Sequence, residues 1–297
     1  MFASNSGPIA GRVLLVDGDA LCYTCAGKDD TSAAQARANV IDRIRRSMAA
    51  AQAERAMVLV TARSSHKGHR YAIADVKPYQ GQRSSGRRPK NWEFLRGYVE
   101  GGVPGYTTEV TEVAEADDLF SKYAIKFGPT NVVHHTQDKD MRMIPGWHLT
   151  WDEFKLTYVE PGAFSHVFND KVYGRKWFWL QMLHGDTADN IPGLPKYIDP
   201  AGKEKLCGEV TAAKLLAECV DEDEARVVVT SLYKGWYGDD WAHRLLEQAV
   251  LLWMRRQPGD VFDVAAEGGP LSKGSVYSQG RDVMLKRIAE VQSCQPG

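Results

Sequence analysis

Aspartate and glutamate residues recur in four short clusters along the 297-residue chain, with types and spacing that suit a divalent metal site. The clusters are Asp17/Asp19, Glu115/Asp117/Asp118, Asp138/Asp140 and Asp186/Asp189. Two unit charges about 4 Å apart repel by roughly 4 kcal/mol at an effective dielectric near 20, so gathering these carboxylates is costly without cations. Divalent cations remove that cost, and carboxylate oxygens suit Mg²⁺. If the clusters converge, they predict a site for two Mg²⁺ ions.

Such a site would hydrolyse phosphodiesters. Two metal ions about 3.5–4 Å apart can activate a water molecule, stabilise the leaving oxygen and clamp the phosphate for in-line attack. A cation such as Arg70 or Arg83 could add positive charge at the transition state. One acidic cluster taken alone is more typical of a helix cap or a solvated loop, and Asp19 is the weakest member for that reason. Four clusters, each at the end of a predicted strand or the start of a predicted helix, favour the metal site.

The elements that must position these acids alternate between strands and helices. Asp17 follows an apolar run at 12–16, and Asp138 follows another at 131–135. Further predicted strands cover 56–61 and 106–110, and predicted helices cover 32–53, 91–99 and 116–127. This alternation predicts an α/β fold with a mostly parallel sheet flanked by helices, in which ligands bind at the carboxyl ends of the strands.

The second half of the chain has a helical pattern. Predicted helices cover 177–184, 208–219, 222–233 and 240–256, and Asp186 and Asp189 lie in a loop after the first of them. Three-residue spacing would place these two acids on one face if that turn were helical. The tail from Gln257 is weakly patterned. We predict an α/β core at 1–175 and a helical subdomain at 176–297.

A basic stretch interrupts the core. Nine Lys or Arg residues lie between Arg63 and Arg96, against only Asp75 and Glu93, although the whole chain has a net charge of −1. Local charge matters more than the sum for a polyanionic ligand. We predict a long basic loop or arch at about 63–90, of the kind that is usually functional or disordered; a solvated surface loop is the alternative.

Composition bounds the remaining possibilities. The chain is 43% hydrophobic and 25% charged, as in ordinary soluble proteins, without a run of about 18 apolar residues or a signal-peptide pattern. We expect a cytoplasmic protein, in the host cytoplasm if a phage encodes it. Five cysteines, at 22, 25, 207, 219 and 294, are too few and too poorly spaced with histidine for zinc, so we expect them to be incidental.

Five motifs occur in a fixed order between residues 12 and 216: LVDG at 15–18, EADD at 115–118, DKD at 138–140, GDTADNIPG at 185–193 and CGEVTAAKLL at 207–216. Together they resemble the 5′→3′ exonuclease and flap-endonuclease superfamily, in particular the exonucleases of short-tailed phages and the 5′-nuclease domain of bacterial DNA polymerase I. The C-terminal third carries little of the resemblance.

The resemblance implies a PIN-like 5′-nuclease fold and two Mg²⁺ ions, for which Mn²⁺ substitutes. Its implied metal ligands are Asp17, Glu115, Asp117, Asp118, Asp138, Asp140, Asp186 and Asp189. It also implies a helix–three-turn–helix at about 185–219, where backbone N–H groups, often with a K⁺ ion, grip duplex phosphates. The DNA-binding candidates there are Gly193, Lys196, Gly208, Thr211 and Lys214.

The basic arch resembles the family pattern R…P-x-Y-K-x-x-R through Arg70 and the segment from Pro78 to Arg83. In the family, such residues contact the scissile phosphate and the threaded strand. The resemblance makes Arg70, Lys77 and Arg83 catalytic candidates beside Asp17, and makes Arg87, Arg88 and Lys90 candidates for strand contact. Tyr23 stands where the family carries an aromatic that stacks on a base, worth about 1–3 kcal/mol; a core aromatic on the first helix is equally open.

Three departures qualify the resemblance. The acid that usually follows the second strand is absent at Thr61-Ala62-Arg63, so the site is one carboxylate leaner or Asp75 supplies it. The lysine of the arch pattern is Gln80, which leaves its role to Lys77 or Arg83. An insertion at 194–207 contains an Asp-Pro-Ala-Gly turn that predicts a hairpin, and its lysines at 196, 203 and 205 could extend a duplex-binding surface.

The function these residues favour is removal of nucleotides from DNA 5′ ends, extending to flaps and to RNA–DNA hybrids. Two alternatives stay open. One is a PIN-type ribonuclease. The other is a structure-specific DNA-binding protein with a lapsed site, which the missing acid near Ala62 keeps open.

Overall fold

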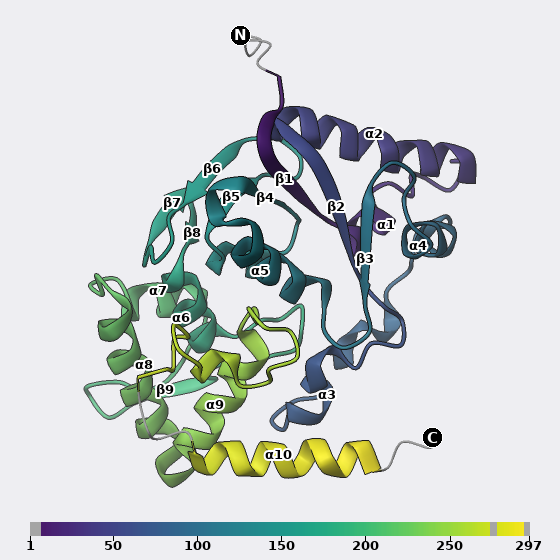
Figure 1. The fold of residues 1–297 in the computed structure, drawn as a ribbon. Coiled ribbons are helices and arrows are strands. Elements are labelled where there is room, and N and C mark those ends of the chain that lie inside the picture. Colours follow the sequence, from purple (N-terminus) through teal and green to yellow (C-terminus); the bar gives the residue numbers. More distant parts are fainter. Residues whose placement is uncertain (1–6, 274–277, 294–297) are drawn as a thin grey trace. The chain divides into compact units, whose positions relative to one another are not determined.

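The computed structural model describes residues 7–273 and 278–293, and the chain divides into two compact units (Figure 1). Unit 1 comprises Met1–Ser65, Gly86–Gly162 and Arg256–Pro258. Unit 2 comprises His66–Ser85, Ala163–Arg255 and Gly259–Gly297. Most of the predicted arch is therefore grouped with the helical second half of the chain.

Unit 1 is built on a six-stranded sheet in the order β3-β2-β1-β4-β5-β6. Its strands are β1 (Ile9–Asp17), β2 (Ala53–Thr61), β3 (Thr107–Thr111), β4 (Val132–His135), β5 (Gly146–Leu149) and β6 (Leu156–Val159). All pairings are parallel except β5 with β6, which closes the edge in the antiparallel sense. The predicted α/β fold with a mostly parallel sheet is confirmed, although β5 and β6 were not predicted.

Helices cover both faces of this sheet because alternate strand residues point to opposite sides. The helices are α1 (Gly18–Thr24), α2 (Ala33–Ala51), α4 (Trp92–Glu100) and α5 (Ala116–Phe127). On β4, His135 contacts Ser47 of α2 (2.9 Å), whereas its neighbour His134 packs against Phe120 of α5. The α1, α2 and α4 side shares one apolar core with Leu14, Val58 and other inward residues. The predicted helices at 32–53, 91–99 and 116–127 are confirmed.

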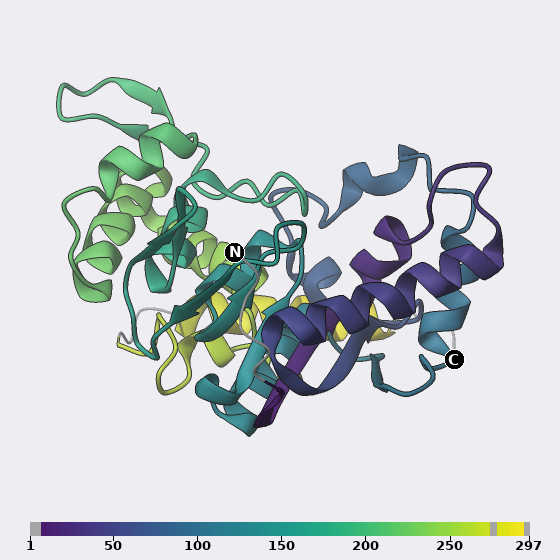
Figure 2. The same ribbon diagram turned by 90° about the horizontal axis from the view of Figure 1, so that it is seen from above.

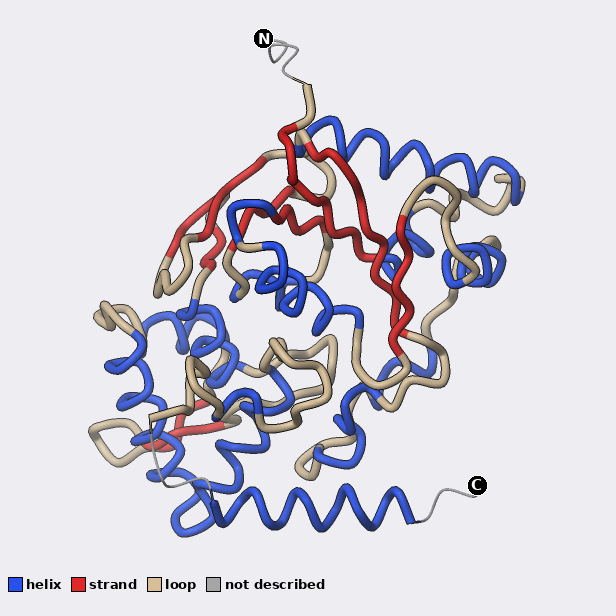
Figure 3. The backbone as a smooth tube through the Cα atoms, in the orientation of Figure 1, coloured by secondary structure: helices blue, strands red, loops and turns tan. Residues whose placement is uncertain are grey.

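Unit 2 is mostly helical (Figure 3). Its helices are α3 (Arg70–Ile73), α6 (Arg175–His184), α7 (Glu209–Leu215), α8 (Glu222–Tyr237), α9 (Trp241–Leu252) and α10 (Ser278–Ser293). Two hairpins accompany them: β7 (His166–Phe168) with β8 (Lys171–Tyr173), and β9 (Lys196–Ile198) with β10 (Glu204–Leu206). The second is the hairpin predicted in the insertion, and Figure 2 shows it projecting from the helices of its unit.

The remaining sequence predictions have mixed outcomes. Short helical segments occupy 67–73 and 81–85, where a continuous loop was expected, and α10 lies in the weakly patterned tail. Cys22, Cys25, Cys207 and Cys219 are buried free thiols, and burial raises the pKa of the Cys22 thiol to about 12. Cys294 lies outside the described residues. Within the described ranges, no helix is long and apolar enough to cross a membrane.

Candidate active site

Asp17 lies at the carboxyl end of β1, next to the residues that follow β4. It caps α1 by accepting a hydrogen bond from the N–H of Ala20 (2.9 Å). The hydroxyl of Thr136 donates to the Asp17 carboxylate (2.7 Å) and accepts from the N–H of Asp138 (2.9 Å). Thr136 therefore joins the first and third acidic motifs, which the parallel pairing of β1 with β4 brings to one edge.

The second acidic motif begins α5. Glu115 and Asp118 form a capping box, in which each side chain accepts from the other residue's backbone N–H. The N–H of Glu115 donates to the Asp118 carboxylate at 3.2 Å. Both acids thereby fix the first turn of the helix, and Asp117 lies between them in sequence.

Asp117 lies among the other acids of unit 1. Burial raises its pKa well above its usual range, and so do the negative charges of four neighbours: Asp138, Asp17, Glu115 and Asp140. The pKa of Asp17 rises to about 6, first through burial and then through the charge of Asp19. The N–H of Asp140 donates to Asp138 (2.8 Å), which fixes the turn carrying both. The sheet edge thus brings together Asp17, Glu115, Asp117, Asp138 and Asp140, with Asp118 beside them in the cap.

Asp19 takes part in a different network. The Arg96 guanidinium forms an ion pair with Asp19 and also with Glu100 (2.8 Å). Arg96 donates in addition to the carbonyl of Thr61 at the end of β2. Asp19 therefore has a cation of the protein itself, which agrees with its being the weakest candidate for metal binding.

Hydroxyl groups stand at the end of β2, where the family pattern has an acid. Thr61 accepts a hydrogen bond from the N–H of Ala116 (2.9 Å), and Ser65 donates to the carbonyl of Ala114 (2.6 Å). Both hydroxyls support the start of α5. The suggestion that Asp75 replaces the absent acid is wrong, because its two oxygens are bound by arginines of unit 2.

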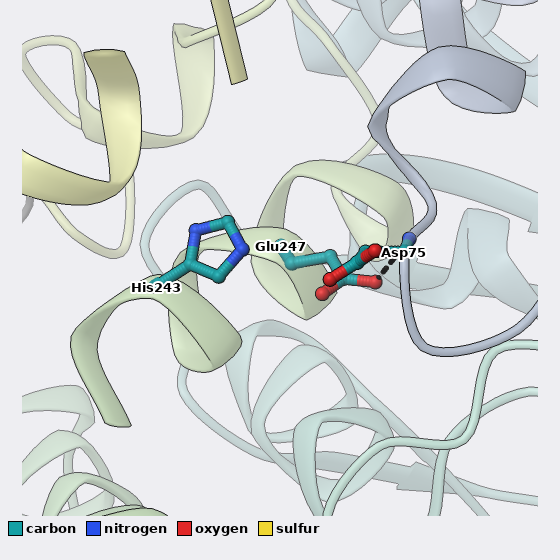
Figure 4. A group of neighbouring side chains, drawn as sticks. All are labelled: Asp75, His243 and Glu247. Atoms are coloured by element: carbon teal, nitrogen blue, oxygen red, sulfur yellow. Dashed lines mark hydrogen bonds between the residues drawn. The ribbon is translucent and has the colours of Figure 1, made fainter. Parts of the chain in front are cut away.

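The surroundings of Asp75 are shown in Figure 4, with His243 and Glu247 of α9. These three side chains have potential ligand atoms within 4.8 Å of one another. However, Arg244 (2.6 Å) and Arg287 (2.7 Å) bind the Asp75 carboxylate, and Glu247 accepts from the backbone N–H of Asp75 (2.7 Å). The group is an ion-pair junction that ties the end of α3 to α9 and α10.

The loop at 185–193 belongs to unit 2 and is closed by two glycines. Asp186 and Ile191 form an antiparallel bridge with two hydrogen bonds of 2.7 Å. A Cβ on Gly185 would lie 2.1 Å from the Ile191 carbonyl oxygen, and one on Gly193 would lie 2.4 Å from the Gly185 nitrogen. Both glycines also have positive φ, +73° and +62°, so only glycine fits.

Within this loop, the two acids are held separately. Asp186 is buried and accepts from the N–H of Ala188 (2.8 Å). Asp189 accepts from the Tyr79 hydroxyl (2.9 Å) and the Gln80 amide (3.0 Å), and it forms an ion pair with Arg83. The segment is a bridge followed by a turn, so the expectation that a helical turn aligns these acids is wrong.

The three basic catalytic candidates differ in their surroundings. Arg70 is fully buried, and its guanidinium donates to the carbonyls of Leu251 (3.3 Å) and Trp253 (3.1 Å) at the end of α9. A contact between Arg70 and the scissile phosphate is therefore contradicted, because the side chain is committed to backbone oxygens. Lys77 is exposed, and Arg83 is half-exposed beside Asp189.

The candidates for strand contact lie on the surface of unit 1. Arg87 pairs with Asp29 (2.9 Å), and Lys90 donates to the Asp29 carbonyl (3.0 Å). Arg88 stacks over the ring of Trp92 at 4.1 Å, and the same ring lies 5.7 Å from that of Tyr23. Tyr23 is 48% exposed, so of the two alternatives for this side chain, the structure favours the surface aromatic over the core aromatic.

The helix–three-turn–helix candidates divide in the same way. Gly208 and Lys214 are exposed at the two ends of α7, and Thr211 is half-buried between them. Lys196 pairs with Glu204 across the inserted hairpin (3.0 Å). Gly193 is buried, and its N–H donates to Gln248 (2.9 Å), so its expected phosphate contact is contradicted.

Sequence reasoning missed several residues that support the acids. Thr136 gave no signal, because a threonine after a strand is unremarkable until the neighbouring strand is known. Gln248 is buried on α9 and satisfies the loop from 55 residues away. The match between Pro78–Arg83 and the family pattern pointed to the arch, but the pairing of that segment with Asp189 needed the fold.

The sheet order, the antiparallel edge strand and the helical unit define the fold of the 5′-nucleases. No family model matches the chain, and no curated protein matches it. Among solved structures, the chain is similar to the T5 D15 protein with metal ions, with 14% identity, a TM-score of 0.56 and coverage of 93% of this chain and 99% of that one.

Two further structures give the same result. A mutant of the T5 5′-exonuclease matches with 15% identity, a TM-score of 0.54 and coverage of 93% and 99%. A variant of the bacteriophage T5 D15 flap endonuclease, in a pseudo-enzyme-product complex with DNA and metal ions, matches with 14% identity, a TM-score of 0.57 and coverage of 94% and 99%. The chain thus has the fold of the T5 5′-exonuclease at low sequence identity.

Proposed function

We propose that this protein is a divalent-metal-dependent 5′→3′ exonuclease that acts on DNA 5′ ends, on flaps and on RNA–DNA hybrids. The observation that carries the proposal is the gathering of Asp17, Glu115, Asp117, Asp138 and Asp140 at one edge of the unit 1 sheet. The fold shared with the T5 D15 flap endonuclease, which was crystallised with DNA and metal ions, supports it.

The donor set fits a hard divalent cation. All five groups offer carboxylate oxygens, the ligands that suit Mg²⁺ and Mn²⁺. The raised pKa of Asp117 means that the net potential at its carboxyl is negative, which a bound cation would offset. We assign Asp186 and Asp189 to a second ion, and a K⁺ ion to the helix–three-turn–helix, on the resemblance alone.

The residues of the chain would prepare the reaction in distinct ways. When bound, the ions would activate water and stabilise charge on the phosphodiester. Thr136 holds Asp17 in one orientation, and the Glu115–Asp118 capping box fixes the turn that presents Asp117. These hydrogen bonds keep the carboxylates in place before substrate arrives, which lowers the reorganisation that the reaction requires.

Exposed cations and aromatics would bind the strand. Lys77 and Arg83 are our candidates for charge near the phosphate, and Tyr23 with Arg88 for contact with an unpaired base. Exposed Lys214, together with the backbone near Gly208, would contact duplex phosphates. Such contacts follow the backbone, so we expect little sequence preference.

The test compares 5′-labelled duplex, flap and RNA–DNA hybrid substrates in Mg²⁺ and in EDTA. We expect Mg²⁺-dependent release of products from the 5′ end by the wild-type protein. Asp117→Asn and Asp138→Asn should each lower kcat by at least about 10²-fold while leaving circular dichroism unchanged. Exposed Asp152→Asn is the matched control.

Each alternative has its own outcome. Cleavage confined to RNA would favour the PIN-type ribonuclease. Tight DNA binding without cutting in Mg²⁺ or Mn²⁺ would favour the lapsed site, in agreement with Thr61 standing where an acid is expected. Full activity in both variants would refute the proposed metal site.

A further inference from the structure

The carboxylate of Asp189 is held by three side chains of the segment Tyr79–Arg83, which belongs to the same unit. Tyr79 donates to one oxygen (2.9 Å), and Gln80 donates to the other (3.0 Å). Arg83 adds an ion pair to that second oxygen. Both oxygens of a predicted metal ligand are therefore engaged by donors of the protein.

Backbone and amide contacts fasten the same two segments. The N–H of Gln80 donates to the carbonyl of Asp189 (2.9 Å), and Asn190 donates to the carbonyl of Pro78 (2.9 Å). Gln82 donates to the carbonyl of Thr187 (2.6 Å). The position of this acid is therefore set by residues more than 100 positions earlier in the chain.

The donors to Asp189 are of two chemical kinds. Tyr79 is 3% exposed and neutral, and its ring packs edge-on against Tyr71 with 5.5 Å between centroids. Arg83 is charged, and its side chain is 51% exposed, whereas that of Asp189 is only 14% exposed. A largely desolvated carboxylate needs a cation, and the arginine is the donor that supplies one.

We propose that Arg83 is a stand-in cation that a divalent ion displaces from Asp189, while Tyr79 is the positioning residue that holds the carboxylate through the exchange. The inference rests on the proposed function, which assigns Asp189 as a metal ligand. Two cations compete for the same oxygen because each repels the other there. Metal loading would therefore release Arg83, which is then available to bind a phosphate.

The proposal gives the two side chains opposite effects on metal affinity. Removing the charge of Arg83 removes a competitor, so Arg83→Gln should bind Mn²⁺ more tightly, by about 3- to 10-fold. Removing the hydroxyl in Tyr79→Phe loosens the ligand, and such supporting contacts typically contribute 10- to 100-fold in metal affinity. A purely structural role for the segment would weaken binding in both variants.

The experiment titrates Mn²⁺ into the full-length protein without nucleic acid, at constant ionic strength, by calorimetry and by electron paramagnetic resonance of the free ion. Arg83→Lys keeps the charge and should bind as wild type does. Arg226→Gln removes a charge on α8, where it pairs with Asp223 (3.0 Å), and serves as the control. Hydrogen exchange of peptides spanning 78–85 should increase with Mn²⁺ in the wild type and not in Asp189→Asn.

The outcomes separate this inference from the proposed function. Weaker or unchanged binding in Arg83→Gln, or exchange at 78–85 that ignores Mn²⁺, would overturn the stand-in role even if the protein cuts DNA. Absence of Mn²⁺ binding and of cleavage in the wild type would instead refute the proposed function. If Arg83→Gln fails to fold, the exchange measurement on the wild type and Asp189→Asn still decides.

Discussion

Replacing Asp17 by asparagine should stabilise the metal-free protein at neutral pH, although it removes a predicted metal ligand. The pKa of Asp17 rises from 3.8 to about 6, because the carboxyl is buried and lies near the charge of Asp19. The folded state therefore binds this proton more tightly than the unfolded chain does. The stabilisation from the proton is complete below about pH 4 and is lost as the pH rises through 6.

The magnitude follows from that difference. One pKa unit corresponds to about 1.4 kcal/mol, so the ionised Asp17 costs the folded protein about 3 kcal/mol above pH 7. Asparagine avoids the charge and can still accept from the N–H of Ala20, but it disturbs the hydrogen bond from Thr136, at a cost of about 1 kcal/mol. We expect a net gain of roughly 2 kcal/mol at pH 8 and none at pH 4.

The assay is urea denaturation of both proteins in EDTA at pH 4, 5, 6 and 8, repeated at pH 8 with Mg²⁺. Mg²⁺ should raise the free energy of unfolding of the wild type more than that of Asp17→Asn, because binding to the folded state is linked to stability. Exposed Asp152→Asn should change the value by no more than about 0.5 kcal/mol. If Asp17→Asn proves less stable than wild type at pH 8 in EDTA, the charge argument is refuted.

Three further predictions concern the supports of the acids. Gly193→Ala should lower stability by at least about 2 kcal/mol in thermal denaturation, because the added Cβ would lie 2.4 Å from the nitrogen of Gly185. Gln248→Leu should cost about 1–3 kcal/mol in the same assay, since it leaves the buried N–H of Gly193 without its acceptor. Thr136→Val should weaken Mn²⁺ binding by about 10-fold in calorimetry with unchanged circular dichroism, because Asp17 loses its orienting hydroxyl; unchanged affinity would contradict that role.

Elements with strong local signals were predictable from the sequence. The bounds of α5 match the prediction at 116–127, since Glu115 and Asp118 cap its start and Gly128 follows its end. In contrast, α10 buries only a few apolar side chains, including Met284 and Ile288, so its pattern is too weak to indicate a helix. Strands β5 and β6 are four residues each and gave no clear alternation.

The acids of the candidate site were predictable as a set, but their individual roles were not. Their order along the chain and the carboxyl-end rule for parallel sheets were enough to expect Asp17 near Asp138. That Asp19 pairs with Arg96, and that Asp75 pairs with Arg244 and Arg287, depends on partners far away in sequence. A sequence pattern gives the type of a residue and its place on an element, whereas its ion-pair partner is a property of the packed fold.

The basic stretch shows the same limit in physical terms. Charge counting treated Arg70 and Arg83 alike, yet the two guanidiniums meet different acceptors. Arg70 donates to the carbonyls of Leu251 and Trp253, where α9 ends and leaves backbone oxygens without helical partners. That end also carries the negative pole of the helix dipole, so a buried cation is stabilised there. Arg83 pairs instead with a carboxylate and keeps half its surface in water, so it can exchange partners while Arg70 cannot.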